Sequence, residues 1–182
     1  MATMPEKPHF IATISVIVAI FLIDQSTKFL AVAFLKPLSS VTVLGEFLRF
    51  TYVENSGIAF GFNIQNTALL NIISMIIAIM IFYVLLNIRD HQRLRVAAAT
   101  ILGGAAGNLF DRLYRGNVVD FIDINFFDIH FDSINLLLWQ FHDVSIYRLP
   151  VFNIADISVT IGMVLVITTV LSKTHISAIA TK

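Results

Sequence analysis

The chain has 182 residues, of which 57% are hydrophobic and only 13% are charged. Because an ordinary soluble domain carries about 25% charged residues and the mean hydropathy here is +0.84, the composition excludes a soluble globular protein and indicates an integral membrane protein. The net charge is zero and no basic patch with interleaved aromatic residues occurs, so nucleic acid is not expected as a partner. Without cysteine, the chain has no disulfide, thiolate nucleophile or cysteine-ligated metal.

Four apolar stretches predict a single integral membrane domain, residues 1–182, with four transmembrane helices. The clearest stretch is 67–88, because it is uncharged and matches the roughly 20 apolar residues that cross a bilayer. Residues 10–35 are interrupted only by Asp24 and Lys28, and they are too long for a cleavable signal peptide. Residues 96–113 and 154–172 reach spanning length only if their adjoining polar motifs lie at membrane depth.

Two long connections, residues 36–66 and 114–153, fall on one side of the predicted helices. Val41–Val53 is rich in β-branched and aromatic residues, which predicts a short hairpin or small sheet on the membrane surface, followed by a turn at Glu54–Gly57. The second connection mixes aromatic residues with aspartates. It is typical of an interfacial flap, with a substrate-facing wall as the alternative.

The orientation is predicted from the short connection between the second and third helices. Arg89, Arg93 and Arg95 fall within seven residues there, and dense positive charge in a short loop indicates the cytoplasmic side. Both termini are then cytoplasmic, and the two long connections are extracytoplasmic.

Asp120 and Asp156 are the candidate catalytic residues. An acid beside a membrane-length apolar run is costly enough for function to be the default hypothesis, and both acids lie at the same predicted side, at the ends of consecutive helices. Two facing carboxylates can share one proton and so supply a base and an acid for water attack on a peptide carbonyl. The alternatives are an exposed loop acid at Asp120 and a helix cap at Asn153-x-x-Asp156.

Further polar residues have both structural and functional explanations. Asn108, Asp111 and Arg112 share one helix face, and a structural role in neutralising charge near the membrane is favoured for Asp111 and Arg112. Asp24 and Lys28, four residues apart, predict an intrahelical pair, or groups that orient backbone or lipid at a site.

Other hydrolytic sites fit the sequence poorly. No His-Glu-x-x-His motif occurs and the five histidines lack metal-ligand spacing, so neither a metal nor a cofactor is expected. Ser56-Gly57 resembles a serine nucleophile, but no histidine lies inside a predicted helix.

Five phrases, in order along the chain, resemble the lipoprotein signal peptidase family, the bacterial membrane aspartyl proteases also called signal peptidase II. They are Asp24-Gln-Ser-Thr-Lys28, Glu54-Asn-Ser-Gly-Ile-Ala-Phe60, Gly107-Asn-Leu-Phe-Asp-Arg112, Val119-Asp-Phe121 and Phe152-Asn-Ile-Ala-Asp156. The segment around Asn125–Arg148 departs from the family pattern and looks like an insertion.

The resemblance implies a mostly α membrane fold of four transmembrane helices, with a small extracytoplasmic β-cradle and a catalytic dyad at Asp120 and Asp156. It implies supporting roles within the matching phrases, and the candidate supporting residues are Asp24, Lys28, Asn55, Gly57, Asn108, Asp111, Arg112 and Asn153.

The same resemblance implies an enzyme of the bacterial cytoplasmic (inner) membrane that is active on its extracytoplasmic face. Its substrates would be prolipoproteins with a diacylglyceryl-modified lipobox cysteine, cleaved just before that cysteine. Membrane lipids and globomycin-type inhibitors would be further partners.

Two other classes of function remain open at this point. A small proton-coupled carrier would use Asp24, Asp120 and Asp156 as relay groups, although a carrier usually has inverted repeats and none is visible. A non-catalytic assembly factor would tolerate isosteric loss of either aspartate.

Overall fold

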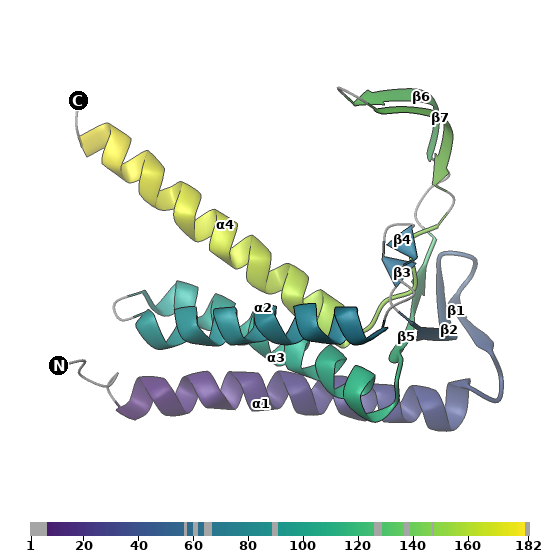
Figure 1. Cartoon of the computed structure of the whole chain (residues 1–182), viewed down its shortest axis with the longest axis horizontal. Helices are drawn as coiled ribbons and strands as arrows, with labels where there is room; N and C mark the ends of the chain where they lie inside the picture. The colour runs from purple at the N-terminus through teal and green to yellow at the C-terminus, as the bar shows by residue number, and fades with distance from the viewer. Residues whose placement is uncertain are drawn as a thin grey trace.

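Four long helices, a three-stranded sheet and two hairpins are the regular elements of the part of the chain that the computed structural model describes, residues 7–56, 58–59, 62–63, 67–88, 91–125, 129–136, 139–146 and 148–180. The helices are α1 (Lys7–Leu30), α2 (Thr67–Asn87), α3 (Gln92–Tyr114) and α4 (Ile154–Ala180), and α1 continues into a π-helical segment, η1 (Ala31–Leu35). The strands gather at one end of the helices, and both chain termini lie at the other (Figure 1). The predicted ranges 10–35, 67–88, 96–113 and 154–172 each correspond to one of these helices.

Two of the helices are long and apolar enough to cross a membrane. Within the described residues these spans are Ile11–Leu35 and Ile154–Ser172, and Asn71–Asn87 of α2 is a shorter apolar helix. Large apolar side chains on α1, α2 and α4 are exposed, among them Leu22, Met80 and Met163. Long helices with apolar outer surfaces fit a hydrocarbon solvent, in which backbone polar groups must bond within the helix.

Helix α3 is the central element, because it packs against α1, α2 and α4. Glycines make the closest approaches possible. A Cβ atom added at Gly104 would lie 2.5 Å from the Ala155 carbonyl oxygen of α4, and one added at Gly162 would lie 2.9 Å from the Ala97 carbonyl oxygen of α3. Small residues at such contacts let helix backbones approach closely, which drives helix association in membranes.

A three-stranded antiparallel sheet lies beyond the ends of the helices, in the order β1-β2-β5. Strands β1 (Ser40–Leu44) and β2 (Leu48–Asn55) form the predicted hairpin, and β5 (Val118–Ile124) pairs with β2, with Val53 opposite Asp120. The predicted turn at Glu54–Gly57 is corrected, because β2 continues to Asn55; Gly57 lies outside the described residues.

The described part of the connection 114–153 consists mainly of strands. It contributes β5 to the sheet and then a hairpin of β6 (Ile129–Leu136) and β7 (Trp139–Ile146), which projects away from the helices (Figure 1). A second short hairpin joins β3 (Ile58–Ala59) and β4 (Phe62–Asn63). Phe152 then forms an antiparallel bridge with Ile122 of β5, so the start of α4 is held against the sheet.

A small apolar core joins the sheet to the first helix. Ala31 and Leu35 of η1 pack with Val119 and Phe121 of β5, and all four are buried. The π-helical register is visible in the bond from the Lys36 N–H to the Ala31 carbonyl oxygen, at 3.0 Å. Ala31 and Leu35 of η1 therefore pack against β5, the strand that carries Asp120. These contacts hold β5 against the end of the first helix.

We expect Gly104→Ala to lower the melting temperature of the detergent-solubilised protein. Alanine is favoured over glycine in a helix by about 1 kcal/mol, but here its methyl group would meet backbone of α4, and overpacking costs roughly 1–3 kcal/mol. Val96→Ala, at an exposed position of α3, is the control and should change the melting temperature little. A Gly104→Ala protein more stable than wild type would contradict the close contact.

Candidate functional site

The site is built around the first turn of α4, which is capped by its own side chains. The Asp156 N–H donates to Asn153 Oδ1 at 3.0 Å, and the Asn153 N–H donates to Asp156 Oδ2 at 3.1 Å. The Ala155 N–H donates to Asp24 Oδ1 of α1 at 2.9 Å. The cap predicted from Asn153-x-x-Asp156 is therefore present, and it satisfies N–H groups that a helix start otherwise leaves open.

Asp120 lies next to this cap and is almost fully buried, with 2% of its surface exposed. Asn153 Nδ2 donates to Asp120 Oδ1 at 2.6 Å, and Asn55 Nδ2 of β2 donates to Asp120 Oδ2 at 2.9 Å. The bridge between Phe152 and Ile122 explains the contact with Asn153, since it brings the residue before α4 alongside β5. Both carboxylate oxygens are thus held by neutral amide donors.

Asn108 connects this pair of residues to Asp156. Asn108 Nδ2 donates to Asp156 Oδ1 at 2.8 Å, while Asn108 Oδ1 accepts from Asn153 Nδ2 at 3.1 Å and from Lys28 Nζ at 2.8 Å. Two donors at one atom identify that atom as the amide oxygen, so the amide nitrogen must face Asp156. Asn108 and Asn153 therefore join the carboxyl groups of Asp120 and Asp156 in one hydrogen-bonded network.

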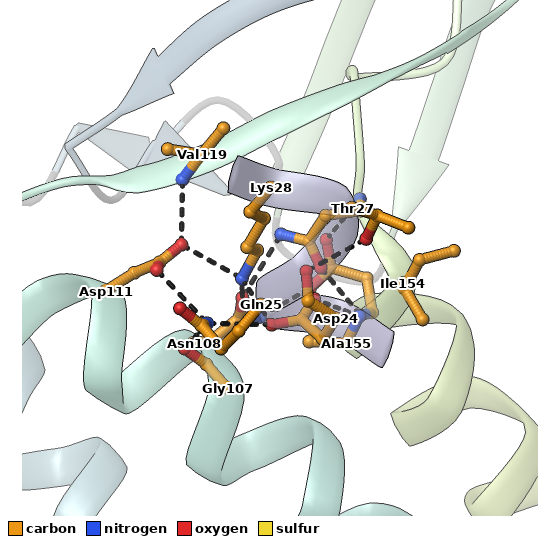
Figure 2. A network of polar contacts seen from close by, with 12 residues as sticks. Asp24, Gln25, Thr27, Lys28, Gly107, Asn108, Asp111, Val119, Ile154 and Ala155 are labelled. Carbon is orange, nitrogen blue, oxygen red and sulfur yellow. Dashed lines mark hydrogen bonds and ion pairs between the residues drawn. The ribbon is translucent and has the colours of Figure 1, made fainter. Parts of the chain in front are cut away.

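A buried cation lies behind the amides. Lys28 is fully buried, and its Nζ atom contacts Asp24 Oδ2 at 2.9 Å, Asp111 Oδ2 at 3.0 Å and Asn108 Oδ1 at 2.8 Å. Figure 2 shows Lys28 among these acceptors, with α1 and α3 contributing most of the network. The intrahelical pair predicted for Asp24 and Lys28 is present, and it extends to a second helix.

The partners of Asp111 differ from the prediction. Asp111 forms ion pairs with Lys28 and Arg115, and its Oδ2 atom accepts the Val119 N–H at 3.1 Å, which ties α3 to β5. Arg112, which was predicted to neutralise Asp111, donates instead to the Asn108 carbonyl oxygen at 3.5 Å. The charges that act on Arg112 most strongly are those of Asp156 and then Asp120, so Arg112 belongs to the side of the network that holds the two candidate carboxylates.

Sequence reasoning missed two members of the network, Gln25 and Arg115. Gln25 Nε2 donates to Asp24, to the Gly107 carbonyl oxygen and to Asp111, at 3.1 to 3.2 Å, and Gln25 Oε1 accepts from Arg115 at 3.0 Å. Gln25 lies inside the first matching phrase, which offered a signal. Arg115 lies three residues beyond the phrase that ends at Arg112. Its spacing of four residues from Asp111 could have indicated an ion pair on one helix face.

Burial raises the pKa of the Asp120 carboxyl to about 6. The hydrogen bonds from Asn55 and Asn153 oppose this rise, and the nearby charge of Asp156 adds to it. Desolvation disfavours the charged form of a carboxyl group, and a neighbouring like charge does the same. The Asp120 side chain can therefore hold a proton close to neutral pH, where an exposed aspartate could not.

A second buried aspartate on β5, Asp123, lies apart from this network. Thr51 Oγ1 donates to Asp123 Oδ2 at 2.6 Å, and Arg148 forms an ion pair with its other oxygen. Of the residues predicted to support the site, only Gly57 falls outside the part of the chain that the structure describes. No group of three or more histidine or carboxylate side chains that could hold a metal ion occurs within that part.

Known proteins resemble the chain over nearly its whole length. The family model for signal peptidase (SPase) II matches residues 16–172. A lipoprotein signal peptidase of Caldanaerobacter subterraneus subsp. tengcongensis is 34% identical over 152 residues, 84% of this chain and 90% of that protein. One of Staphylococcus aureus is 35% identical over 172 residues, 93% of this chain and 94% of that protein.

Solved structures agree with the sequence matches. A bacterial membrane enzyme, solved at 2.3 Å resolution, superposes with a TM-score of 0.73 at 32% identity, covering 96% of this chain and 94% of that chain. A second bacterial membrane enzyme, solved at 1.9 Å, gives a TM-score of 0.71 at 32% identity, covering 94% and 97% of the two chains. The chain belongs to the signal peptidase II family of membrane proteases.

Proposed function

We propose that this protein removes signal peptides from prolipoproteins as an aspartic endopeptidase, with Asp120 and Asp156 as its catalytic pair. The observation that carries the proposal is the network in which Asn108 and Asn153 join the two carboxyl groups at the first turn of α4. The names of the relatives support the substrate class.

The proposed chemistry needs one proton on the pair. The ionised carboxylate takes a proton from a water molecule as its oxygen attacks the carbonyl carbon of the scissile peptide bond. The protonated carboxyl group gives its proton to the carbonyl oxygen. When the tetrahedral intermediate collapses, the carbon–nitrogen bond breaks, the leaving amine takes a proton from the pair, and a hydroxyl group of the intermediate returns a proton to the pair. The pair therefore ends with one proton, as it began. Arg112 supplies a positive charge that favours a pair with one net negative charge.

The supporting residues have separate proposed roles. Asn55, Asn108 and Asn153 hold the carboxyl groups through neutral donors. The group of Asp24, Lys28 and Asp111 fixes the helices from which those amides extend. Gly57 keeps the supporting role that its phrase implies.

The proposed setting is a four-helix protein, one integral domain, in the bacterial cytoplasmic membrane. Its termini are cytoplasmic, and the sheet and the site face the other side. The substrate cysteine carries a diacylglyceryl group, and acyl chains partition into lipid at about 0.8 kcal/mol per buried CH₂. The bilayer therefore holds the bond before that cysteine at a constant depth. Globomycin-type inhibitors are expected to occupy the same site.

The carrier hypothesis is not supported. Asp24, Asp120 and Asp156 would have to be distributed through the membrane to relay protons, yet all three belong to one network at the start of α4. Membership of a protease family also argues against transport as the primary activity.

Substitution by asparagine tests the catalytic pair. We expect Asp120→Asn and Asp156→Asn each to lower kcat by at least about a hundredfold, since one acid-base group usually contributes 10²–10⁴-fold. Asp123→Asn is the matched control, because Asp123 is equally buried on the same strand but bonds to Thr51 and Arg148. It should keep kcat within a few-fold of wild type.

Cleavage of a diacylated prolipoprotein peptide in detergent is the assay, with the melting temperature as the check on folding. Substantial turnover in both Asp120→Asn and Asp156→Asn would show that the pair is misassigned. A loss of turnover in Asp123→Asn alone would indicate that Asp123, and not the pair of Asp120 and Asp156, takes part in catalysis.

The pH dependence follows from the raised pKa of Asp120. We expect a bell-shaped profile of kcat/KM, whose two apparent pKa values belong to the pair. Its descending limb should lie at or above the value of about 6 for Asp120, because the rate falls once both acids are ionised. A rate that keeps rising into strongly alkaline solution would exclude this mechanism.

The same shift predicts an effect on stability that needs no activity. The folded protein binds the Asp120 proton more tightly than the unfolded chain does. Protonation of Asp120 therefore stabilises the folded state at low pH. This stabilisation is lost as pH rises from about 4 to about 6, by of the order of 3 kcal/mol. The melting temperature of wild type should therefore fall relative to that of Asp120→Asn across this window.

Orientation in the membrane can be measured with single cysteines, because the chain has none of its own. We expect a cysteine at Gln92, in the first turn of α3, to resist an impermeant thiol reagent in intact cells. A cysteine at Thr42, in the exposed strand β1, should react. The opposite pattern would place the sheet and the site in the cytoplasm.

A further inference from the structure

A groove with a mainly apolar lining and several polar side chains lies between α3 and α4, at the end of the helices opposite the sheet. The two helices touch near Ala97 and Gly162 and then separate, and α4 leans away from the other helices in Figure 1. The cavity has a volume of about 350 Å³, within the roughly 300–1,000 Å³ of small-molecule sites. Its lining consists of Gln92, Arg93, Val96, Leu165, Thr168, Thr169 and Ser172.

The α3 side of the groove is positively charged. Arg93 is exposed and sits in the first turn of α3, where the helix contains no acidic residue. The N-terminal turn of a helix adds a partial positive charge to that of the guanidinium. An anionic group with oxygen acceptors fits this side, and a phosphate is recognised well by an arginine fork.

The α4 side of the groove offers acceptors but few donors. The hydroxyl hydrogens of Thr168, Thr169 and Ser172 are already used, because each hydroxyl donates to a carbonyl oxygen of its own helix at 2.6 to 2.8 Å. A hydroxyl has one hydrogen and two lone pairs. With their hydrogens directed to these carbonyl groups, the three side chains present lone pairs that accept hydrogen bonds from a ligand.

The remaining lining is apolar and runs along the helices. Val96 and Leu165 line the groove between its polar residues and the helix contact, so they offer an apolar surface against which part of an alkyl chain can pack. A ligand that matches this groove has three properties together, namely an anionic group, a neighbouring hydrogen-bond donor and an apolar tail.

We propose that this groove binds a phospholipid, with the phosphodiester on Arg93 and a donor of the headgroup on the hydroxyl oxygens of α4. Phosphatidylglycerol meets all three requirements, and phosphatidylethanolamine supplies the same phosphodiester with an ammonium donor. Basic pockets between membrane helices bind lipid headgroups in this way. The site is separate from the aspartate network and does not depend on which side of the membrane the groove faces.

Native mass spectrometry of the full-length protein in detergent tests the proposal, with phosphatidylglycerol, phosphatidylethanolamine and phosphatidylcholine of identical acyl chains. Phosphatidylcholine has the phosphodiester but no headgroup donor, so wild type should retain it less well than the other two. Arg93→Gln should weaken phosphatidylglycerol binding about tenfold, the loss expected for a charge-assisted hydrogen bond. Lys36→Gln removes one positive charge directly after η1, at the sheet end of the helices, and should bind as wild type does.

A double variant tests the second half of the site. Thr168→Val with Thr169→Val keeps the shape of the side chains but removes two of the three hydroxyl oxygens, so it should lower the preference over phosphatidylcholine while phosphatidylcholine binding remains. The proposal is overturned if phosphatidylglycerol is retained equally by wild type and Arg93→Gln. It is also overturned if Lys36→Gln shows the same loss, which would mean that the bound lipid is a nonspecific shell responding to net charge.

Discussion

The position of every residue in the candidate site depends on one buried ammonium group, that of Lys28. Moving an ion out of water costs several kcal/mol even after relaxation, and this cost is offset only if each N–H finds an acceptor. The three acceptors of Lys28 are Asp24 of its own helix and Asp111 and Asn108 of α3. Because none of the three can withdraw without leaving a buried N–H group of the ammonium without an acceptor, these contacts hold α1 and α3 together.

The fixed pair of helices then determines where α4 begins. Asp24 accepts the Ala155 N–H with one oxygen and the Lys28 ammonium with the other, and Asn108 reaches Asp156. This convergence requires a small residue at Gly107, where an added Cβ atom would collide with the Asp24 carboxylate. The glycine among these polar residues is therefore explained by the ion network as well as by helix packing.

Short-range patterns predicted the parts of this arrangement that are local in sequence. The cap at Asn153 and Asp156, the pair at Asp24 and Lys28 and the β1–β2 hairpin each follow from spacings of a few residues. The pairing of Asp111 with Lys28 could not be found in this way, because Lys28 lies on another helix and helix spacing reveals only neighbours three or four positions away, such as Arg115. The β6–β7 hairpin had a signal that was read differently, since apolar residues alternate in Trp139-Gln-Phe-His and Ile129-His-Phe.

The buried carboxylates Asp111 and Asp120 differ in the charge of the side chains that bind them. Asp111 is bound directly by the two cations Lys28 and Arg115, and its contact with Lys28 joins α1 to α3. Asp120 is bound by the neutral amides of Asn55 and Asn153. Amides fix the geometry of a carboxyl group without the full attraction that a contacting cation exerts on its ionised form. Burial can then raise the pKa of Asp120, so the desolvation that costs stability also leaves a proton available for catalysis.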